Sequence, residues 1–265
     1  MKSTAVAAWQ KAPIKVVSFD LDDTLWPIAE VIQNAEAAHD LWLRETFPDC
    51  WNAETSNWMM TCRQRLREEA GGHCLTFVRK QTLEAYFRYV GFSASVAQAN
   101  AEQAFEVFRV YRNRVQPLAG VRALLNQLRS CSKVASLTNG NVDLDQTSLK
   151  GHFHLELNPE RAGTRKPHAD MFYAVSDHFD VKPETVLHIG DHYEDDVQGA
   201  LRAGMNALWL VHDHHVLGRV GEHKAQMTRW TEAHNREPVA PCVTTISELR
   251  AFLFSAVNFA SSVSS

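Results

Sequence analysis

Residues 14–24 read IKVVSFDLDDT, in which a short, mostly apolar run at 14–19 with three β-branched residues is followed by a group of carboxylates. A run of this kind is typical of a buried strand. Because side chains two residues apart in a strand share a face, Asp20 and Asp22 can point toward one site. We therefore predict a buried strand over residues 14–19 with acidic groups gathered directly after it.

Short apolar runs alternate with helical segments again after Pro117. The pattern predicts strands at 133–137, 185–189 and 206–211, a further short strand near 153–157, and helices at 121–129, 169–179, 196–203 and 247–257, the last with Ser247 as its N-cap. Such alternation indicates an α/β fold with a parallel sheet covered on both faces.

The segment between these two parts has a different pattern. Helical spacing runs through residues 30–47, 76–90 and 93–111, and no convincing strand interrupts it. A helical insert of roughly 90 residues is large enough to form a small domain. We predict a core of residues 1–26 and 116–265, with residues 27–115 inserted after the first strand.

The composition is that of a globular protein, with 45% hydrophobic and 22% charged residues among 265. A net charge of −4 offers no steering toward nucleic acid. The five cysteines form no CxxC pair, and no apolar run approaches the roughly 20 residues that cross a bilayer. We expect a cytoplasmic protein, either a monomer or a homodimer, that binds neither nucleic acid nor membrane.

The ends of the later strands also carry polar groups. Thr138-Asn139 follows the strand at 133–137, and Gly190-Asp191 follows the strand at 185–189, with Asp195 and Asp196 shortly after. Between these two motifs lies Lys166-Pro167. Functional side chains of parallel sheets gather beyond the carboxyl ends of the strands, so these groups are expected to converge.

This set of groups is suited to phosphoryl chemistry. Converging carboxylates repel one another unless a cation compensates them, and hard oxygen ligands favour Mg²⁺. Lys166 and the hydroxyl of Thr138 add donors for a phosphoryl group. One carboxylate can then attack phosphorus, while another protonates the leaving oxygen and later takes a proton from water. Each motif alone is a weak signal, but their joint order predicts a phosphatase.

In this order the motifs resemble those of the haloacid-dehalogenase superfamily over nearly the whole chain. The resemblance implies a Rossmann-like parallel-sheet core with a helical cap domain inserted after the first strand. It implies that Asp20 is the nucleophile and Asp22 the acid/base. It further implies that Thr138, Asn139 and Lys166 hold the substrate phosphate.

The same resemblance implies a metal site for Mg²⁺. Its residues would be Asp20, Asp22 through its backbone carbonyl, Asp191 and Asp196, the last supporting the metal's waters or Lys166. Asp195 competes with Asp196 for this role, and we favour Asp196. The insert is similar to the helical cap of subfamily I, and the chain looks most like bacterial phosphatases of flavin mononucleotide and the riboflavin pathway.

Several activities occur in this superfamily, and Asp22 separates some of them. Dehalogenases lack an acid/base at that position and need no Mg²⁺, so Asp22 favours hydrolysis of a small-molecule phosphate ester. A phosphomutase or a sugar phosphatase stays open, whereas filled catalytic positions argue against a non-enzymatic binding protein. Trp26 could stack on a substrate ring or simply pack, and we expect His212, His214 and His215 to form a surface loop rather than a metal site.

Overall fold

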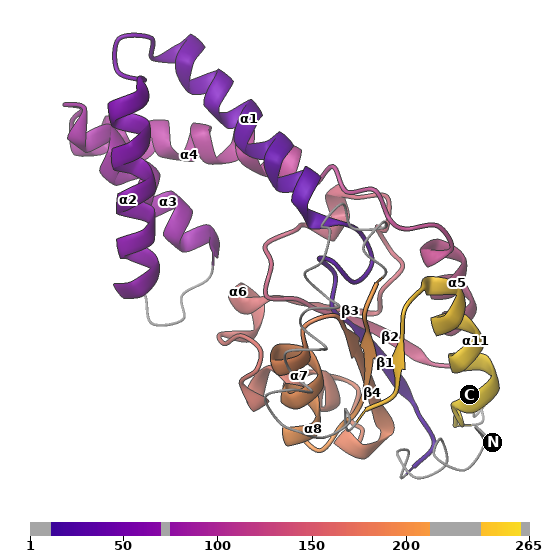
Figure 1. Ribbon diagram of the computed structural model, residues 1–265. Coiled ribbons are helices and arrows are strands. Elements are labelled where there is room, and N and C mark those ends of the chain that lie inside the picture. The colour runs from indigo at the N-terminus through magenta and orange to yellow at the C-terminus, as the bar shows by residue number, and fades with distance from the viewer. Residues whose placement is uncertain (1–11, 70–74, 213–239, 261–265) are drawn as a thin grey trace, which may run out of the picture. The chain divides into compact units, whose positions relative to one another are not determined.

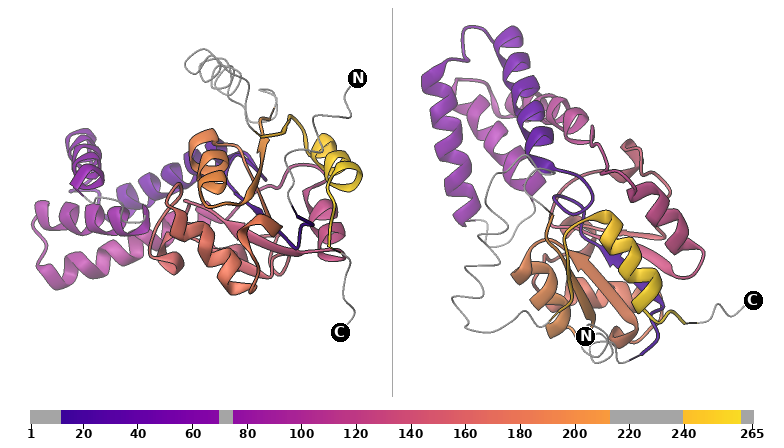
Figure 2. Two further views of the ribbon diagram at one scale, coloured as in Figure 1. Left: turned by 90° about the horizontal axis from the view of Figure 1, so that it is seen from below. Right: turned by 45° about the vertical axis from the view of Figure 1, so that its right-hand side comes forward.

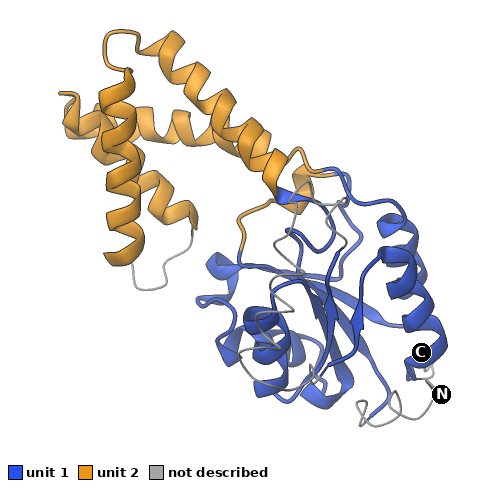
Figure 3. Ribbon diagram, in the orientation of Figure 1, with its two compact units in different colours: residues 1–28, 116–139, 148–265 blue, residues 29–115, 140–147 orange. Residues whose placement is uncertain are grey.

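The computed structural model of the chain describes residues 12–69, 75–212 and 240–260. The chain divides into two compact units, shown in Figure 3. One comprises residues 1–28, 116–139 and 148–265 and contains the sheet; the other comprises residues 29–115 and 140–147 and is helical. The predicted role of the helical unit as a cap stays a prediction.

The described part of the first unit contains a six-stranded parallel sheet. Its order is β3 (Leu155–Leu157), β2 (Lys133–Leu137), β1 (Val16–Phe19), β4 (Val186–Gly190), β5 (Asn206–Leu210) and β6 (Cys242–Val243). Phe19 is in register with Ser136 of β2 and with Ile189 of β4. The residues that follow β1, β2 and β4 therefore leave the sheet at the same edge, and the predicted α/β fold with a parallel sheet is confirmed.

Helices cover both faces of this sheet, as Figures 1 and 2 show. The face with α7 (Ala169–His178) and α8 (Gly199–Arg202) packs a continuous apolar cluster that includes Val16, Phe172 and Trp209. The opposite face carries α5 (Val121–Arg129) and α11 (Ile246–Ala256). A short helix, α6 (Pro159–Ala162), follows β3. This two-sided burial explains why the strands read as nearly unbroken apolar runs.

One helix start differs from the sequence prediction. Helix α11 begins one residue before Ser247, and its N-cap is Thr245, whose hydroxyl oxygen accepts a hydrogen bond from the backbone N–H of Glu248. The expected Ser247 cap is therefore wrong. Ile246 is buried and lies inside the first turn, so the helix has to start early enough to bring this side chain into the core.

The second unit contains four helices in its described residues, α1 (Ile28–Thr46), α2 (Ala53–Glu69), α3 (Leu75–Tyr89) and α4 (Ala94–Arg112). Its core is aromatic, and Phe87 makes edge-to-face contacts with Phe47 and Phe92. Helix α2 was not singled out in the sequence because it is strongly polar and buries only Met59 and Cys62. None of the helices in the described ranges is apolar over a length that would cross a bilayer.

A charged cluster lies inside the helical unit. Glu36 of α1 accepts hydrogen bonds from Arg63 of α2 at 3.0 Å and from Arg79 of α3 at 2.7 Å. The Arg79 guanidinium also lies 3.5 Å from the centre of the Phe108 ring. Burial alone would raise the pKa of Glu36, but the hydrogen bonds and charge of Arg79, with the charge of Arg63, lower it from 4.5 to about 2. These arginines are therefore part of the packing between helices and not a purely solvated surface.

Candidate active site

The predicted site residues of the core converge at the carboxyl edge of the sheet. Asp20 directly follows β1, Thr138 follows β2, and Asp191 follows β4; all three are buried. The backbone N–H of Asp20 donates to the carbonyl of Ile189, which fixes the nucleophile candidate between β1 and β4. Thr24 joins two of the carboxylates, because its hydroxyl lies 3.1 Å from Asp191 and 3.4 Å from Asp20.

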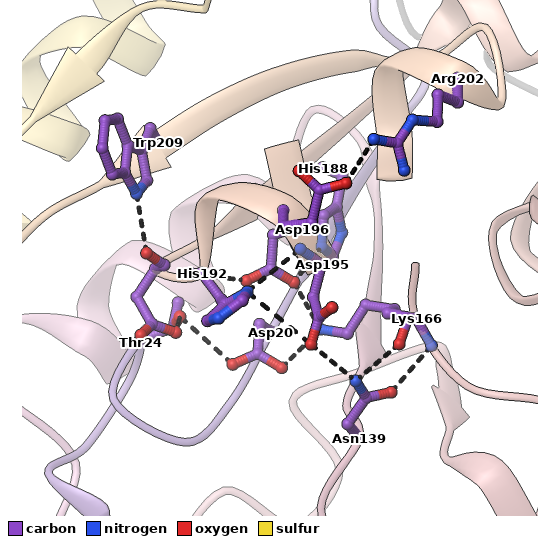
Figure 4. A network of polar contacts seen from close by, with 12 residues as sticks. Asp20, Thr24, Asn139, Lys166, His188, His192, Asp195, Asp196, Arg202 and Trp209 are labelled. Atoms are coloured by element: carbon purple, nitrogen blue, oxygen red, sulfur yellow. Dashed lines mark hydrogen bonds and ion pairs between the residues drawn. The ribbon is translucent and has the colours of Figure 1, made fainter. Parts of the chain in front are cut away.

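The ammonium group of Lys166 lies between Asp20 and Asp196 (Figure 4). Its ammonium nitrogen is 2.6 Å from a carboxylate oxygen of Asp20 and 2.6 Å from one of Asp196, and its side chain is only 2% exposed. Two close carboxylates stabilise the charged lysine, so its pKa rises despite burial. The sequence left Asp195 and Asp196 as alternative partners of the metal's waters or of Lys166, and in the structure Lys166 bonds to Asp196.

Asn139 holds the main chain of Lys166 from both sides. Its side-chain oxygen accepts from the Lys166 N–H at 2.8 Å, and its amide nitrogen donates to the Lys166 carbonyl at 3.0 Å. The same amide also lies 3.2 Å from a carboxylate oxygen of Asp195. These bonds give Asn139 a role in placing Lys166, while its expected contact with substrate phosphate stays a prediction.

Asp196 lies in the π-helix Tyr193–Gln198 and is held on both of its oxygens. One oxygen accepts from Lys166 and lies 3.1 Å from His188 Nε2; the other accepts from the His192 N–H at 2.9 Å. His188 Nδ1 is in turn 2.9 Å from the hydroxyl of Ser18. Burial opposes the charge of Asp196, but Lys166 and His188 outweigh it and lower the pKa of this carboxyl.

Neither Ser18 nor His188 was identified from the sequence. Both are fully buried inside the sheet, so this Ser-His-Asp chain cannot meet a substrate and acts through Asp196. Burial lowers the pKa of His188, which favours a neutral ring that donates to Asp196 and accepts from Ser18. A histidine inside the otherwise apolar strand VLHIG was the available signal.

Three carboxylates form a group that could hold a metal ion. One ligand oxygen each from Asp20, Asp191 and Asp196 lie within 4.8 Å of one another. Burial raises the pKa of Asp20 from 3.8 to about 7, and the Asp196 and Asp22 charges add to the rise. Burial also raises the pKa of Asp191 well above its ordinary value, with Asp20 and Asp196 contributing. Such a repelling group of hard oxygen donors fits Mg²⁺, which would relieve the repulsion.

The carboxylate of Asp22 is not part of this three-carboxylate group and accepts a separate hydrogen bond. The indole Nε1 of Trp26 donates to an oxygen of Asp22 at 2.9 Å. Trp26 is completely buried, so of the two alternatives left open by the sequence, the structure favours packing over stacking on a substrate ring. Asp22 and Trp26 lie close together because the chain turns back on itself between them. Asp23 is in the left-handed region at φ 58°, and its N–H donates to the Trp26 carbonyl.

The predicted surface loop at residues 212–215 is also wrong at its first position. His212 is buried beyond β5, and its Nε2 lies 2.8 Å from the carbonyl oxygen of Thr24. It therefore supports the turn that follows Asp20. His214 and His215 lie outside the described residues, as does most of the segment 212–241 whose role the sequence left open.

With this geometry, the family of the chain can be stated. The profile of the haloacid dehalogenase-like hydrolases matches residues 14–204, which include every motif described above. The chain therefore belongs to the haloacid dehalogenase-like hydrolase family. The phosphatases among its relatives support a phosphoric monoester hydrolase within that family.

Two relatives and one solved structure are similar over most of their length. The 5-amino-6-(5-phospho-D-ribitylamino)uracil phosphatase YigB of Escherichia coli is 30% identical, covering 74% of this chain and 83% of the relative. A glyceraldehyde 3-phosphate phosphatase of Methanopyrus kandleri is 27% identical, covering 72% and 82%. The crystal structure of a 2-haloacid dehalogenase from Pseudomonas syringae pv. tomato is 31% identical, covering 91% and 98%, with a TM-score of 0.76.

Proposed function

We propose that the protein is a Mg²⁺-dependent phosphatase that hydrolyses a small phosphorylated metabolite through an aspartyl-phosphate on Asp20. The observation that carries this proposal is the position of Asp20 between the buried ammonium group of Lys166 and the carboxylates of Asp191 and Asp196. Lys166 lies 2.6 Å from one oxygen of Asp20, and Asp191 and Asp196 complete the group. A nucleophilic carboxylate beside charge-neutralising groups is what phosphoryl transfer needs.

The reaction follows from the residues present. A carboxylate oxygen of Asp20 attacks phosphorus, and the bond from phosphorus to the leaving oxygen breaks as Asp22 donates a proton to that oxygen. Water then attacks the phosphorus of the acyl phosphate and gives a proton to Asp22, which releases inorganic phosphate and restores Asp20. Lys166 and the hydroxyl of Thr138 are the proposed donors to the transferring phosphoryl group.

Mg²⁺ would be held by Asp20, Asp191, the Asp22 backbone carbonyl and, directly or through water, Asp196, and it would neutralise phosphate charge. The pKa of Asp20 is raised to about 7 even with Lys166 beside it, so a further cation would favour the ionised, nucleophilic form. The protein's own residues therefore support the metal requirement. That requirement and the presence of Asp22 separate this proposal from a dehalogenase, although one similar structure is a 2-haloacid dehalogenase.

The substrate proposal rests on relatives and not on a bound molecule. The similarity to YigB supports a phosphorylated ribityl compound of the riboflavin pathway, and flavin mononucleotide carries the same phosphoribityl group. The glyceraldehyde 3-phosphate phosphatases support a sugar or triose phosphate as the second candidate. Trp26 no longer favours a ring-bearing ester, because it is buried and its indole N–H is bonded to Asp22.

A panel of esters tests the proposal. Purified protein is assayed with 5-amino-6-(5-phospho-D-ribitylamino)uracil, flavin mononucleotide, glyceraldehyde 3-phosphate, a nucleoside monophosphate, a phosphopeptide and a 2-haloacid, and kcat/KM is compared. We expect the highest value for a phosphoribityl ester, and no phosphate release from Asp20→Asn. Turnover of only the 2-haloacid would refute the phosphatase. A requirement for a sugar bisphosphate activator would instead indicate a phosphomutase.

A further inference from the structure

Two buried tryptophans, Trp26 and Trp209, donate their indole N–H groups near the carboxyl edge of the sheet. A buried indole N–H needs an acceptor, and a backbone carbonyl is the common solution. Trp209 follows that rule: it is equally buried and donates to the carbonyl oxygen of Asp191 at 2.7 Å. Trp26 instead donates at 2.9 Å to a side-chain oxygen of Asp22.

Backbone hydrogen bonds hold the loop that carries Asp22 and Trp26. Asp22 and Trp26 form an isolated β-bridge, and the N–H of Asp23 donates to the Trp26 carbonyl at 2.8 Å. On the far side of the turn, the Asp23 carboxylate accepts from the N–H of Ile28 at 2.9 Å. The position of the Trp26 ring is thus fixed by burial and by main-chain bonds. The indole can therefore impose an orientation on Asp22 rather than adapt to it.

We propose that Trp26 is a positioning residue that orients the Asp22 carboxyl group for proton transfer to the leaving oxygen. This inference rests on the proposed phosphatase activity. A bond to one oxygen restricts the orientations that the carboxyl group can take. Proton transfer in a transition state depends on such geometry, and a small misplacement of the acid is costly. Because Trp26 is completely buried, we assign its ring no contact with the substrate.

The leaving group distinguishes this role from a general structural one. As the bond from phosphorus breaks, a poor leaving oxygen has to receive the proton from Asp22, whereas 4-nitrophenolate departs without it. Removing the indole N–H should therefore slow esters of alcohols and spare esters of acidic phenols. The value of kcat/KM reports the steps up to cleavage of the ester bond, so it isolates this proton donation from the later hydrolysis of the acyl phosphate.

The experiment compares Trp26→Phe with the wild type on 4-nitrophenyl phosphate, phenyl phosphate and glycerol phosphate. General acid catalysis contributes about 10²–10⁴-fold, so a misoriented acid should lower kcat/KM for glycerol phosphate by roughly 10- to 100-fold. The loss for 4-nitrophenyl phosphate should stay below about 3-fold. Asp22→Asn should give the same trend with a larger amplitude.

Trp209→Phe is the matched control, because it removes an equally buried indole N–H that bonds to backbone instead of Asp22. Its loss should be uniform across the three esters. Circular dichroism and thermal unfolding report folding. Should Trp26→Phe fail to fold, site-specific 3-benzothienylalanine at position 26 replaces the N–H by sulfur in the same bicyclic shape and answers the question.

The outcomes separate the two claims. A wild type that hydrolyses none of these esters or the metabolites above would refute the phosphatase itself. An active wild type with equal losses for all leaving groups in Trp26→Phe, or with no loss, would overturn the positioning role alone. A leaving-group-dependent loss that follows Asp22→Asn and is absent from Trp209→Phe supports it.

Discussion

The ammonium group of Lys166 bonds to Asp20 and to Asp196 at the same distance, 2.6 Å. The nucleophile candidate therefore shares its cation with a carboxylate that has a lowered pKa, whereas burial raises the pKa of Asp20 itself to about 7. The lysine alone does not fully compensate the charge on Asp20. The ionised form of Asp20 therefore destabilises the folded protein unless a further cation is bound.

Replacing Asp20 by asparagine should abolish phosphate release and leave the protein at least as stable. The amide keeps the shape but cannot attack phosphorus. A carboxyl whose pKa is higher in the folded protein than in the unfolded chain destabilises the fold as pH rises from about 4 through 7. At pH 8 in EDTA, Tm of Asp20→Asn should equal or exceed that of wild type. Near wild-type turnover would contradict the nucleophile assignment, and a much lower Tm would contradict the stability argument.

Mg²⁺ should bind to the carboxylate group even without substrate. Because Asp20 and Asp191 repel each other, a bound cation stabilises the folded state, by about 2.7 kcal/mol at a concentration 100 times Kd. Thermal unfolding with and without Mg²⁺ measures this effect. Asp191→Asn removes one ligand and should lose most of the Mg²⁺-dependent rise in Tm. EDTA should also stop turnover, and full activity after exhaustive chelation would refute the metal requirement.

Gly190 should not tolerate a side chain. A Cβ atom at this position would lie 2.6 Å from Cβ of Asp196 and closer still to its carboxyl group, so Asp196 would have to move. Displacing Asp196 also displaces Lys166. Gly190→Ala should lower kcat by at least about 10-fold, since misplacement near 1 Å can cost about 100-fold.

Gly91→Ala provides the comparison for that experiment. It adds a methyl group in open space at a left-handed position of the helical unit, with φ 99°. Backbone strain should lower its stability by about 1 kcal/mol while kcat is unchanged. A loss of kcat in Gly91→Ala of the same size as in Gly190→Ala would show that the effect comes from stability and not from the position of Asp196.

The Glu36 cluster predicts a pH-dependent stability difference. Its lowered pKa means that its contribution is complete above the unfolded value of 4.5 and lost as pH falls toward about 2. Because the side chain is 37% exposed, screening reduces the contribution to roughly 1 kcal/mol. Glu36→Gln should therefore be less stable than wild type at pH 7, and the difference should shrink as pH falls below 4.5. Urea unfolding of both proteins at pH 7 and at a pH below 4.5 measures the difference in the free energy of unfolding.

Glu102→Gln provides the matched control, because it breaks an exposed ion pair with Lys80. The Glu102 side chain is 55% exposed. It should change stability by less than about 0.5 kcal/mol. A pH-independent loss in Glu36→Gln, or an equal loss in Glu102→Gln, would contradict the role assigned to the Glu36 cluster.

The sequence predicted those features that depend on local pattern. The strand at 133–137 and the helix at 121–129 have the predicted bounds, because the strand is a continuous buried run and the helix buries residues at helical spacing. The shared position of Asp20 and Asp191 followed from the rule that parallel strands share one functional edge, whereas Lys166 was predicted from its place between two motifs. Strand β6 was not predicted, because two residues carry no periodic signal.

The partners of the site residues could not be predicted, because they depend on contacts between distant segments. Ser18 meets His188 and His212 meets Thr24 across separations of 170 and 188 residues. The link between Asp22 and Trp26 is local, but a tryptophan after an acidic turn is compatible with stacking, packing or hydrogen bonding. Only the buried position of the indole distinguishes these possibilities.

Residues 140–147 have a consequence for dissecting the protein into fragments. They follow β2 in sequence but group with the helical unit, where Asn141 accepts from the buried Arg112 at 3.2 Å and Asp143 pairs with Arg109. A recombinant fragment ending at residue 115 would lose both partners and expose an incomplete surface. The helical unit is therefore a discontinuous module, and grafting it onto another scaffold requires a second, eight-residue peptide in trans or a rewired chain.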